Sequence, residues 1–354
     1  MERILVKGNE AVGWGGLMAG ADAFFGYPIT PQNEITEWFA REFPKRGKVF
    51  VQSQSETGTI NMLLGAAAAG ARAMTSTATP GFALMQEVMP HLAVSELPAV
   101  IALVQRGGPG SGHIRHSQTS YVDAIYAGGG GAHSIVLAPS SAQEACDFVQ
   151  LAFYLADKYR NPAVVLSDAM TGQTMESLEV RALEFGDLPD KDWAVRGRDF
   201  NKDGQRHDMF NGPWGPWVTH IEHLERKYQT IARTEVRYEE DHIEDADLVL
   251  VAFGYMGRCC KEAVLMARAE GIRAGLLRPI TLWPFPSEAI RNLADRGCRF
   301  LVAEDNMGQM VRDVRLAVEG RADVHTLNAS ARDVPTGAGV IFPHRVLQEI
   351  QKLA

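Results

Sequence analysis

The 354-residue sequence lacks the common motifs of single-chain catalysis. It has no serine-centred nucleophile elbow, no His-Glu-x-x-His pair for zinc, and no dinucleotide-binding fingerprint after its first predicted strand. Its cysteines, Cys146, Cys259, Cys260 and Cys298, lack the Cys-x-x-Cys spacing of zinc, iron–sulfur and redox sites. We therefore expect reduced thiols and no metal site, and any cluster needed for electron transfer would belong to another chain.

The sequence also lacks an excess of positive charge and any long apolar run. Its formal net charge is -8 and its isoelectric point is near 5.7, which argues against nucleic acid as the main partner. No run of about 18 apolar residues is present, and Met1 leads directly into a short apolar strand rather than a signal-peptide core. We expect no membrane span and a cytoplasmic location.

Apolar segments alternate with helical ones, which predicts an α/β fold with a doubly wound, mainly parallel sheet. The run at 97–105 is continuous and apolar, as in a strand buried on both faces of a parallel sheet, and we predict a further strand at 162–168. A polar excursion at 180–236 interrupts this rhythm and ends in a predicted helix from about 219 to 233. We also predict helices at about 82–94 and at 142–158, the second capped by Ser140 and Ser141. We predict a first domain at 1–237, which includes the excursion, and a smaller α/β domain at 238–354.

The first candidate functional residue is Glu56, which lies between a predicted strand at 49–51 and a small-residue helix at 60–70. Its carboxylate would lie in the first helical turn, at the carboxyl end of a strand, where ligands bind in open α/β sheets. The alternative is a structural carboxylate that the exposed amides and dipole of the helix N-terminus favour.

Two further candidates follow apolar strands. In the Gly26–Pro31 connection, two prolines restrict the backbone, and we predict Thr30 as the N-cap of a helix at 32–39. A simple cap is the alternative to a ligand-binding hydroxyl. Arg106 follows the strand at 97–105 and precedes a glycine-rich loop that could approach a ligand or a neighbouring subunit closely. The alternative role for Arg106 is a surface ion pair. Glu56, Thr30 and Arg106 do not form a complete catalytic set. They fit a chain that supplies one half of an active site shared with another subunit.

Several stretches, in one order over nearly the whole chain, carry a family pattern. They comprise residues 7–11, 26–32, 60–72, 106–110, 157–162, 278–286 and 308–318. Through them the chain resembles the alpha subunit of 2-oxoacid:ferredoxin oxidoreductases, in the pyruvate:ferredoxin oxidoreductase superfamily, and especially the branched-chain 2-oxoacid (2-ketoisovalerate) type. The resemblance implies a pyrimidine-domain fold of the thiamine diphosphate type followed by a transketolase C-terminal-like domain.

The resemblance also implies roles for individual residues. Glu56 matches the glutamate that bonds N1′ of thiamine diphosphate and favours the imino tautomer that takes the thiazolium C2 proton. Thr30 and Pro28, with Tyr27 beside them, match the loop over cofactor and substrate, and the Thr30 hydroxyl would reach the 2-oxo group. Arg106 matches the arginine that pairs with the substrate carboxylate.

The family pattern further implies partner subunits. The Gly-Asp-Gly motif that holds magnesium and the diphosphate is missing from this sequence, so a beta subunit would carry it together with Mg²⁺. Gamma and ferredoxin-like subunits would complete the complex with [4Fe-4S] clusters on the partner subunits. An oxygen-sensitive complex of this kind decarboxylates a 2-oxoacid, passes electrons to ferredoxin or another acceptor, and forms an acyl-CoA from coenzyme A. The chain alone would be inactive.

Two segments depart from the family pattern, at 113–120 and 199–217. In the first, His113, Ser117 and Gln118 are candidate substrate-binding residues, although solvated loop residues are an alternative reading. These departures leave the 2-oxoacid open, with a branched-chain or aromatic substrate preferred.

Two other function classes stay open from the sequence. A non-catalytic assembly or regulatory subunit would keep the fold and lose the chemistry, and the presence of Glu56 counts against it. A phosphate or nucleotide enzyme would use the glycine loops and bind its ligand without a partner.

Overall fold

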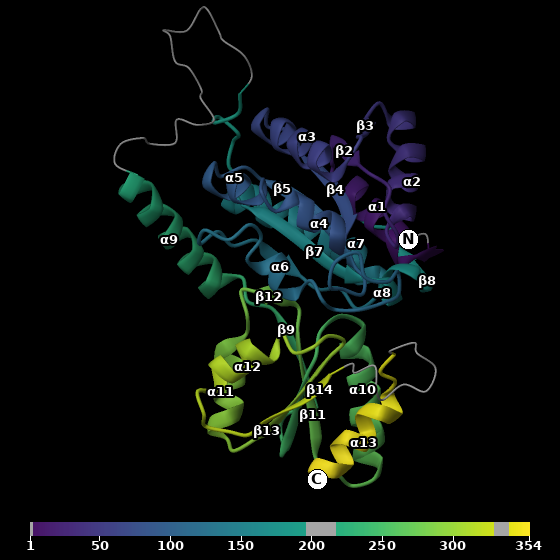
Figure 1. The fold of residues 1–354 in the computed structure, drawn as a ribbon, viewed down its shortest axis with the longest axis vertical. Helices are drawn as coiled ribbons and strands as arrows, with labels where there is room; N and C mark the ends of the chain where they lie inside the picture. The colour runs from purple at the N-terminus through teal and green to yellow at the C-terminus, as the bar shows by residue number, and fades with distance from the viewer. Residues whose placement is uncertain (1–2, 196–216, 329–339) are drawn as a thin grey trace, which may run out of the picture.

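The structure is a computed structural model that describes residues 3–195, 217–328 and 340–354. Two sheets, each covered by helices, follow one another along the long axis of the molecule (Figure 1). The larger sheet is built mainly from the N-terminal part of the chain, and the smaller one from the C-terminal part. This arrangement confirms the predicted α/β fold with a larger unit followed by a smaller one.

The larger sheet has the order β12-β6-β7-β5-β4-β2-β3. Its strands are β2 (Ala23–Gly26), β3 (Val49–Gln52), β4 (Ala73–Ala78), β5 (Ala99–Gln105), β6 (Ile135–Leu137), β7 (Pro162–Asp168) and β12 (Thr281–Trp283). All neighbours are parallel except β12, which runs antiparallel to β6. Every residue of β5 and β7 is buried, which confirms the doubly buried strand predicted at 97–105 and the further strand predicted at 162–168.

Helices cover both faces of this sheet, because alternate side chains of its strands point to opposite faces. In β5, Val100, Ala102 and Val104 belong to one core cluster, whereas Ile101 and Leu103 belong to the other. The first cluster includes α1 (Gly8–Met18), α2 (Asn33–Glu42) and α7 (Ala142–Tyr159). The second includes α3 (Glu56–Ala68), α4 (Thr79–Met85), α5 (Met89–Val94) and α6 (Tyr121–Ile125).

Shorter elements complete the first unit. A two-stranded antiparallel sheet pairs β1 (Arg3–Lys7) with β8 (Met175–Glu179). The remaining helices are the 3-10 turn η1 (Pro44–Arg46), α8 (Ala169–Gln173) and α9 (Trp217–Thr234). Helix α9 confirms the helix predicted near the end of the polar excursion, whereas 196–216 and most of the atypical 199–217 segment lie outside the described residues.

The smaller sheet has the order β14-β13-β10-β11-β9, with β9 antiparallel and the other neighbours parallel. Its strands are β9 (Tyr238–Asp241), β10 (Leu248–Val251), β11 (Ala274–Pro279), β13 (Arg299–Glu304) and β14 (Val324–Asn328). Helices α11 (Ser287–Asp295) and α12 (Val311–Val318) pack against each other, as do α10 (Gly254–Ala269) and α13 (Pro343–Leu353). We call this unit, residues 238–354, the second domain.

Two local predictions are wrong. Helix α2 begins at Asn33 with Gln32 at its N-cap, so Thr30 does not cap it. Gln32 is fully buried and donates Nε2 to the Tyr27 carbonyl at 3.0 Å, which turns the chain before the helix starts. The predicted helix at 82–94 is broken into α4 and α5, because Pro90 has no N–H for an intrahelical bond and suits the first turn of a new helix.

Candidate functional site

The predicted site residues follow adjacent strands of the larger sheet. Strands β3, β2, β4 and β5 are parallel neighbours, so the segments that follow them meet at one edge. Glu56 follows β3, residues 27–30 follow β2, residues 79–81 follow β4, and Arg106 follows β5. This carboxyl edge is where open α/β sheets bind ligands.

Glu56 is the first residue of α3 and is 5% exposed. Ser55 caps the helix and accepts a hydrogen bond from the Gly58 N–H at 3.2 Å, so Glu56 is not needed as the cap. Among the described residues, the Glu56 carboxylate has no hydrogen-bond or ion-pair partner. A nearly buried carboxylate without a partner is costly, and a ligand that donates a hydrogen bond would relieve that cost.

The N-terminus of α4 passes directly over the Glu56 side chain. A Cβ placed on Gly81 would lie 2.5 Å from Glu56 Oε1 and 2.2 Å from Thr77 Oγ1. Only glycine therefore allows this approach without a shift of the neighbouring side chains.

The loop after β2 presents Thr30 at the same edge. Thr30 and Pro28 are exposed and Tyr27 is half-buried. The loop is fixed to α1, because Asn9 of that helix donates its Nδ2 to the Pro31 carbonyl at 2.7 Å. Since Thr30 does not cap α2, its hydroxyl is not committed to the helix.

Arg106 contacts the loop after β2, the start of α4 and the glycine-rich loop that follows Arg106 itself. Its Nη1 donates to the Thr30 carbonyl and its Nη2 to the Ser111 carbonyl, both at 2.9 Å. Its main-chain N–H donates to Thr79 Oγ1 at 3.1 Å. The Nε atom is buried and has no partner within the described ranges. The guanidinium thus lies beside Thr30, and its buried Nε–H could donate a hydrogen bond to an anion.

The structure therefore brings Thr30 and Arg106 into direct contact and places Glu56 on the same edge. The link to Glu56 runs through the start of α4, where Gly81 contacts Glu56 and Thr79 bonds to Arg106. Thr79 and Gly81 were not among the predicted site residues. The signal for them was the series of hydroxyl residues at the end of β4, followed by Thr79, Pro80 and Gly81.

The other three candidates lie differently. His113 is exposed, its ring lies against Gly107, and its N–H donates to the Gly107 carbonyl at 3.0 Å. Ser117 and Gln118 are buried, and their side chains donate to main-chain carbonyls of the second domain. The structure does not bring these two side chains to the Glu56 edge, and their assignment to substrate stays a prediction.

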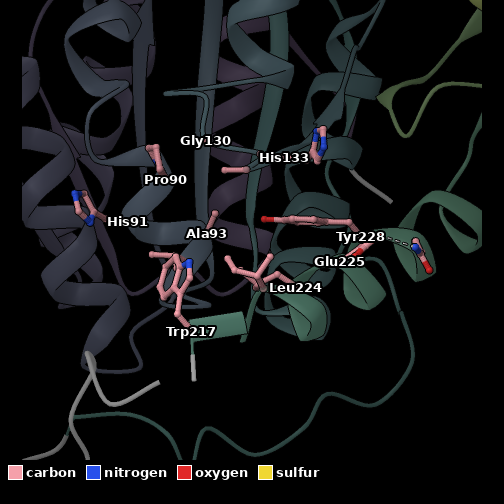
Figure 2. Close-up of a pocket in the computed structure, with 14 residues that line it drawn as sticks. Pro90, His91, Ala93, Gly130, His133, Trp217, Leu224, Glu225 and Tyr228 are labelled. Atoms are coloured by element: carbon pink, nitrogen blue, oxygen red, sulfur yellow. Dashed lines mark hydrogen bonds between the residues drawn. The ribbon is translucent and has the colours of Figure 1, made fainter. Parts of the chain in front are cut away.

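A separate cavity of about 540 Å³ lies between α5, the glycine run near 130 and α9. Figure 2 shows Pro90 and His91 of α5 on one side and Leu224 and Tyr228 of α9 on the other. None of the predicted site residues lines this cavity. It is therefore distinct from the edge that carries Glu56, Thr30 and Arg106.

Two features are absent from the residues that the structure describes. No helix in those ranges is both long and apolar enough to cross a membrane. No group of three or more histidine, cysteine, aspartate or glutamate side chains is arranged there to hold a metal ion.

Two family models match the chain. Residues 15–242 match the thiamine diphosphate-binding domain of pyruvate flavodoxin/ferredoxin oxidoreductases. Residues 246–336 match core domain II of pyruvate:ferredoxin oxidoreductase.

Curated relatives match over almost the full length. The ketoisovalerate oxidoreductase subunit VorB of Methanothermobacter thermautotrophicus is 47% identical, over 99% of this chain and 97% of its own. The 2-oxoglutarate synthase subunit KorA of Methanothermobacter marburgensis is 35% identical, over 92% of this chain and 94% of its own.

Two solved structures share the fold of this chain. The 2-oxoglutarate:ferredoxin oxidoreductase from Magnetococcus marinus, solved with 2-oxoglutarate, coenzyme A and succinyl-CoA bound, superposes with a TM-score of 0.84 at 26% identity. The match covers 99% of this chain and 65% of that one. A split-gene transketolase, at 17% identity and a TM-score of 0.64, shares the fold over 98% of this chain and 97% of its own. The chain thus belongs to the 2-oxoacid:ferredoxin oxidoreductase family, as an enzyme subunit with the thiamine diphosphate-binding domain and core domain II.

Proposed function

We propose that this chain is the pyrimidine-binding subunit of a complex that oxidatively decarboxylates a branched-chain 2-oxoacid to an acyl-CoA and CO₂. The observation that carries the proposal is the sheet edge that holds both Glu56, a buried carboxylate with no partner in the described part of the chain, and the contact between Thr30 and Arg106. The 47% identity to a ketoisovalerate oxidoreductase subunit supports the branched-chain substrate. An aromatic 2-oxoacid is the alternative substrate. We place the domain boundary at 237/238, just before β9.

The residues at this edge fit the aminopyrimidine end of thiamine diphosphate. Glu56 would accept a hydrogen bond from N1′ and hold a proton there, because its burial strengthens a charge-assisted bond. Thr30, Pro28 and Tyr27 would flank the cofactor from the neighbouring loop. When bound, thiamine diphosphate supplies the nucleophilic carbon and the electron sink that decarboxylation of a 2-oxoacid requires.

Arg106 would bind the carboxylate of the substrate. Its Nε donor lacks a partner among the described residues, and its Nη donors are held only by main-chain carbonyls. A carboxylate is a stronger acceptor than a neutral carbonyl. It could therefore accept a hydrogen bond from Nε and replace a main-chain carbonyl as the acceptor for one Nη. The Thr30 hydroxyl would then face the 2-oxo oxygen. Because every 2-oxoacid carries this carboxylate, Arg106 would anchor the substrate without discriminating between acyl groups. We keep His113, Ser117 and Gln118 as proposed determinants of acyl selection.

The partner would dock over α3. This helix carries no charged residue except the buried Glu56, and its exposed positions include Asn61, Met62 and Gly65. Leu84 of α4 is 55% exposed. A helix with apolar and small residues on all sides is typically buried. We propose that the beta subunit covers this face and brings Mg²⁺ and the diphosphate site.

The remaining parts of the complex follow from the reaction. We propose gamma and ferredoxin-like subunits, [4Fe-4S] clusters on the partners, ferredoxin or another electron acceptor, and coenzyme A as co-substrate. Within the chain, the Cys-x-x-Cys spacing needed for such clusters is missing from the sequence.

The test is Glu56→Gln in the assembled complex. The amide keeps the shape but removes the charge that holds a proton at N1′, so we expect turnover to fall by about 10²-fold or more with assembly intact. Glu262→Gln, an exposed substitution on α10, is the matched control and should retain turnover. Near-normal turnover of Glu56→Gln would refute the proposed role and favour a non-catalytic subunit.

Calorimetry with thiamine diphosphate distinguishes the proposed function from the remaining alternative, a phosphate or nucleotide enzyme that binds its ligand without a partner. The proposal predicts binding by the assembled complex and none by the lone chain. Tight binding of a phosphate or nucleotide ligand by the lone chain would instead support a self-contained phosphate site.

A further inference from the structure

The segment at 116–120 joins the two domains through Gln118. The Gln118 N–H donates to the Asp305 carbonyl at 2.8 Å, and its Nε2 donates to the Phe253 carbonyl at 2.8 Å. Its Oε1 accepts from the Asp305 N–H at 3.1 Å, and its carbonyl accepts from Asn306 Nδ2 at 2.8 Å. Gln118 is fully buried, so these bonds fix the segment to the second domain.

The same segment holds the main chain of Arg106. Gln309 of the second domain donates Nε2 to the Thr119 carbonyl at 2.8 Å and accepts from the Val122 N–H at 3.1 Å. Thr119 Oγ1 donates to the Arg106 carbonyl at 3.0 Å. Thr79 Oγ1 accepts from the Arg106 N–H at 3.1 Å and donates to the same Arg106 carbonyl at 3.2 Å. A single residue, Thr119, therefore separates Gln309 from Arg106.

The main chain at Gln309 is itself fixed by hydrogen bonds to Glu304. Glu304 is fully buried, and its carboxylate accepts from the main-chain N–H groups of Gln309, Met310 and Val311 at 3.0, 2.8 and 3.1 Å. A buried carboxylate with three such donors fixes the start of α12 in position. The Gln309 side chain therefore bonds to the Thr119 carbonyl from a position that Glu304 fixes within the second domain.

We propose that Gln309 is a positioning residue for Arg106, and that the second domain sets the guanidinium at the substrate edge through Thr119. This inference rests on the proposed function of Arg106 as the carboxylate anchor. A guanidinium binds a carboxylate well only in a narrow geometry, and small displacements at a distance from the reacting atoms reduce rates strongly. Gln309 acts through Thr119 and does not touch the substrate.

The test uses Gln309→Glu in the assembled complex. Glutamate keeps the size of the side chain and the acceptor for Val122, but places an oxygen against the Thr119 carbonyl. We expect KM for the 2-oxoacid to rise roughly three- to tenfold, with kcat and thiamine diphosphate affinity nearly unchanged. Gln351→Glu is the control with the same charge change, because Gln351 bonds Glu270 within the second domain. It should leave KM unchanged.

A double-mutant cycle with Arg106→Lys shows whether Gln309 acts through Arg106. Arg106→Lys alone should raise KM, and adding Gln309→Glu should then change KM by less than about twofold. Equal effects of Gln309→Glu in both backgrounds, or no effect in either, would overturn the inference and leave Arg106 as the anchor. An unchanged KM in Arg106→Lys would overturn the anchor role, and the inference with it.

A second pair of variants tests the relay from the first domain. Thr119→Val removes the hydroxyl that bonds to Arg106 and should raise KM as Gln309→Glu does. Thr119→Ser keeps the hydroxyl and should restore a KM close to that of the unmodified complex. Equal KM values for the two Thr119 variants would overturn the relay even if Gln309→Glu fails to fold.

Discussion

At the scale of single residues, Asp168 shows how a useful cap can carry an electrostatic cost. It ends β7 and is almost completely buried. Burial raises the pKa of its carboxyl to about 6, and the nearby Asp305 charge adds to that rise. Hydrogen bonds from the N–H groups of Thr171, at 2.8 Å, and Tyr255, at 3.4 Å, oppose it. The carboxylate therefore caps α8 at the expense of desolvation.

Asp168→Asn should change the pH dependence of stability. The pKa in the folded state is raised above its ordinary value of 3.8, so the stability contributed by protonated Asp168 is present below that value and is lost as pH rises through about 6. We expect the free energy of unfolding of the unmodified chain, relative to that of the variant, to fall by about 2 kcal/mol between about pH 4 and 7. Asparagine can still cap Thr171. Urea unfolding across this range is the measurement, and a pH-independent difference would contradict the prediction.

At the scale of elements, the close approach of α4 to α3 shapes the site. Gly81 lies in the first turn of α4 and Glu56 in the first turn of α3, and the missing side chain of Gly81 lets the two turns meet. Parallel pairing of β3, β2 and β4 brings these helix starts to one edge. The position of the Glu56 carboxylate thus depends on packing between elements as well as on its own helix.

Gly81→Ala should displace the Glu56 carboxylate, because the added Cβ would overlap it and Thr77 Oγ1. We expect a loss of stability of about 1 to 3 kcal/mol, with weaker binding of thiamine diphosphate by the assembled complex. In Gly58→Ala the new Cβ would meet Ser53 Cβ at an ordinary 3.5 Å, so this control should keep both properties. Unfolding of the chain and calorimetry of the complex measure them. Equal behaviour of the two variants would show that the site tolerates a side chain at position 81.

At the scale of the whole molecule, the two domains are held together by buried polar contacts and a shared sheet. Arg278 of β11 is 3% exposed and makes a two-pronged ion pair with Glu144 of α7, with N–O distances of 2.6 and 3.0 Å. Its Nε also bonds Glu239 at 2.8 Å. Strand β12, which follows β11 in sequence, pairs with β6 in the larger sheet. The second domain is therefore fixed on the first.

Removing Arg278 should weaken this association. Arg278→Met leaves Glu144 without its cation in a mostly buried contact, and we expect a loss of about 2 to 4 kcal/mol, because Glu144 keeps some access to water. Arg273→Met, which breaks an exposed pair with Asp247, should cost much less, because solvent screens that pair. Thermal unfolding of both variants is the measurement. A cost for Arg278→Met no larger than that for Arg273→Met would contradict the role of this ion pair.

Much of the fold could be read from local patterns. A continuous apolar run predicted β5, because a strand buried on both faces typically has apolar side chains along its length. The strand β7 was also predicted from the sequence. Ser141 was predicted to cap α7, and its hydroxyl accepts from the Glu144 N–H at 3.1 Å. Glu56 was placed correctly at a strand-to-helix junction. Each of these features depends on neighbours within a few residues along the chain.

Other features depend on contacts that no local pattern contains. The bond between Arg106 and Thr30 joins residues 76 positions apart, and Gln118 bonds to residues of the second domain. The start of α2 was also misjudged from the sequence. The break between α4 and α5 was missed as well, although Pro90 gave a local signal for it. The sequence alone determined which segments become buried strands and helices, because periodicity and capping act over a few residues. Only the tertiary structure decided which loops share an edge, because strand order and domain packing set the partners of distant residues.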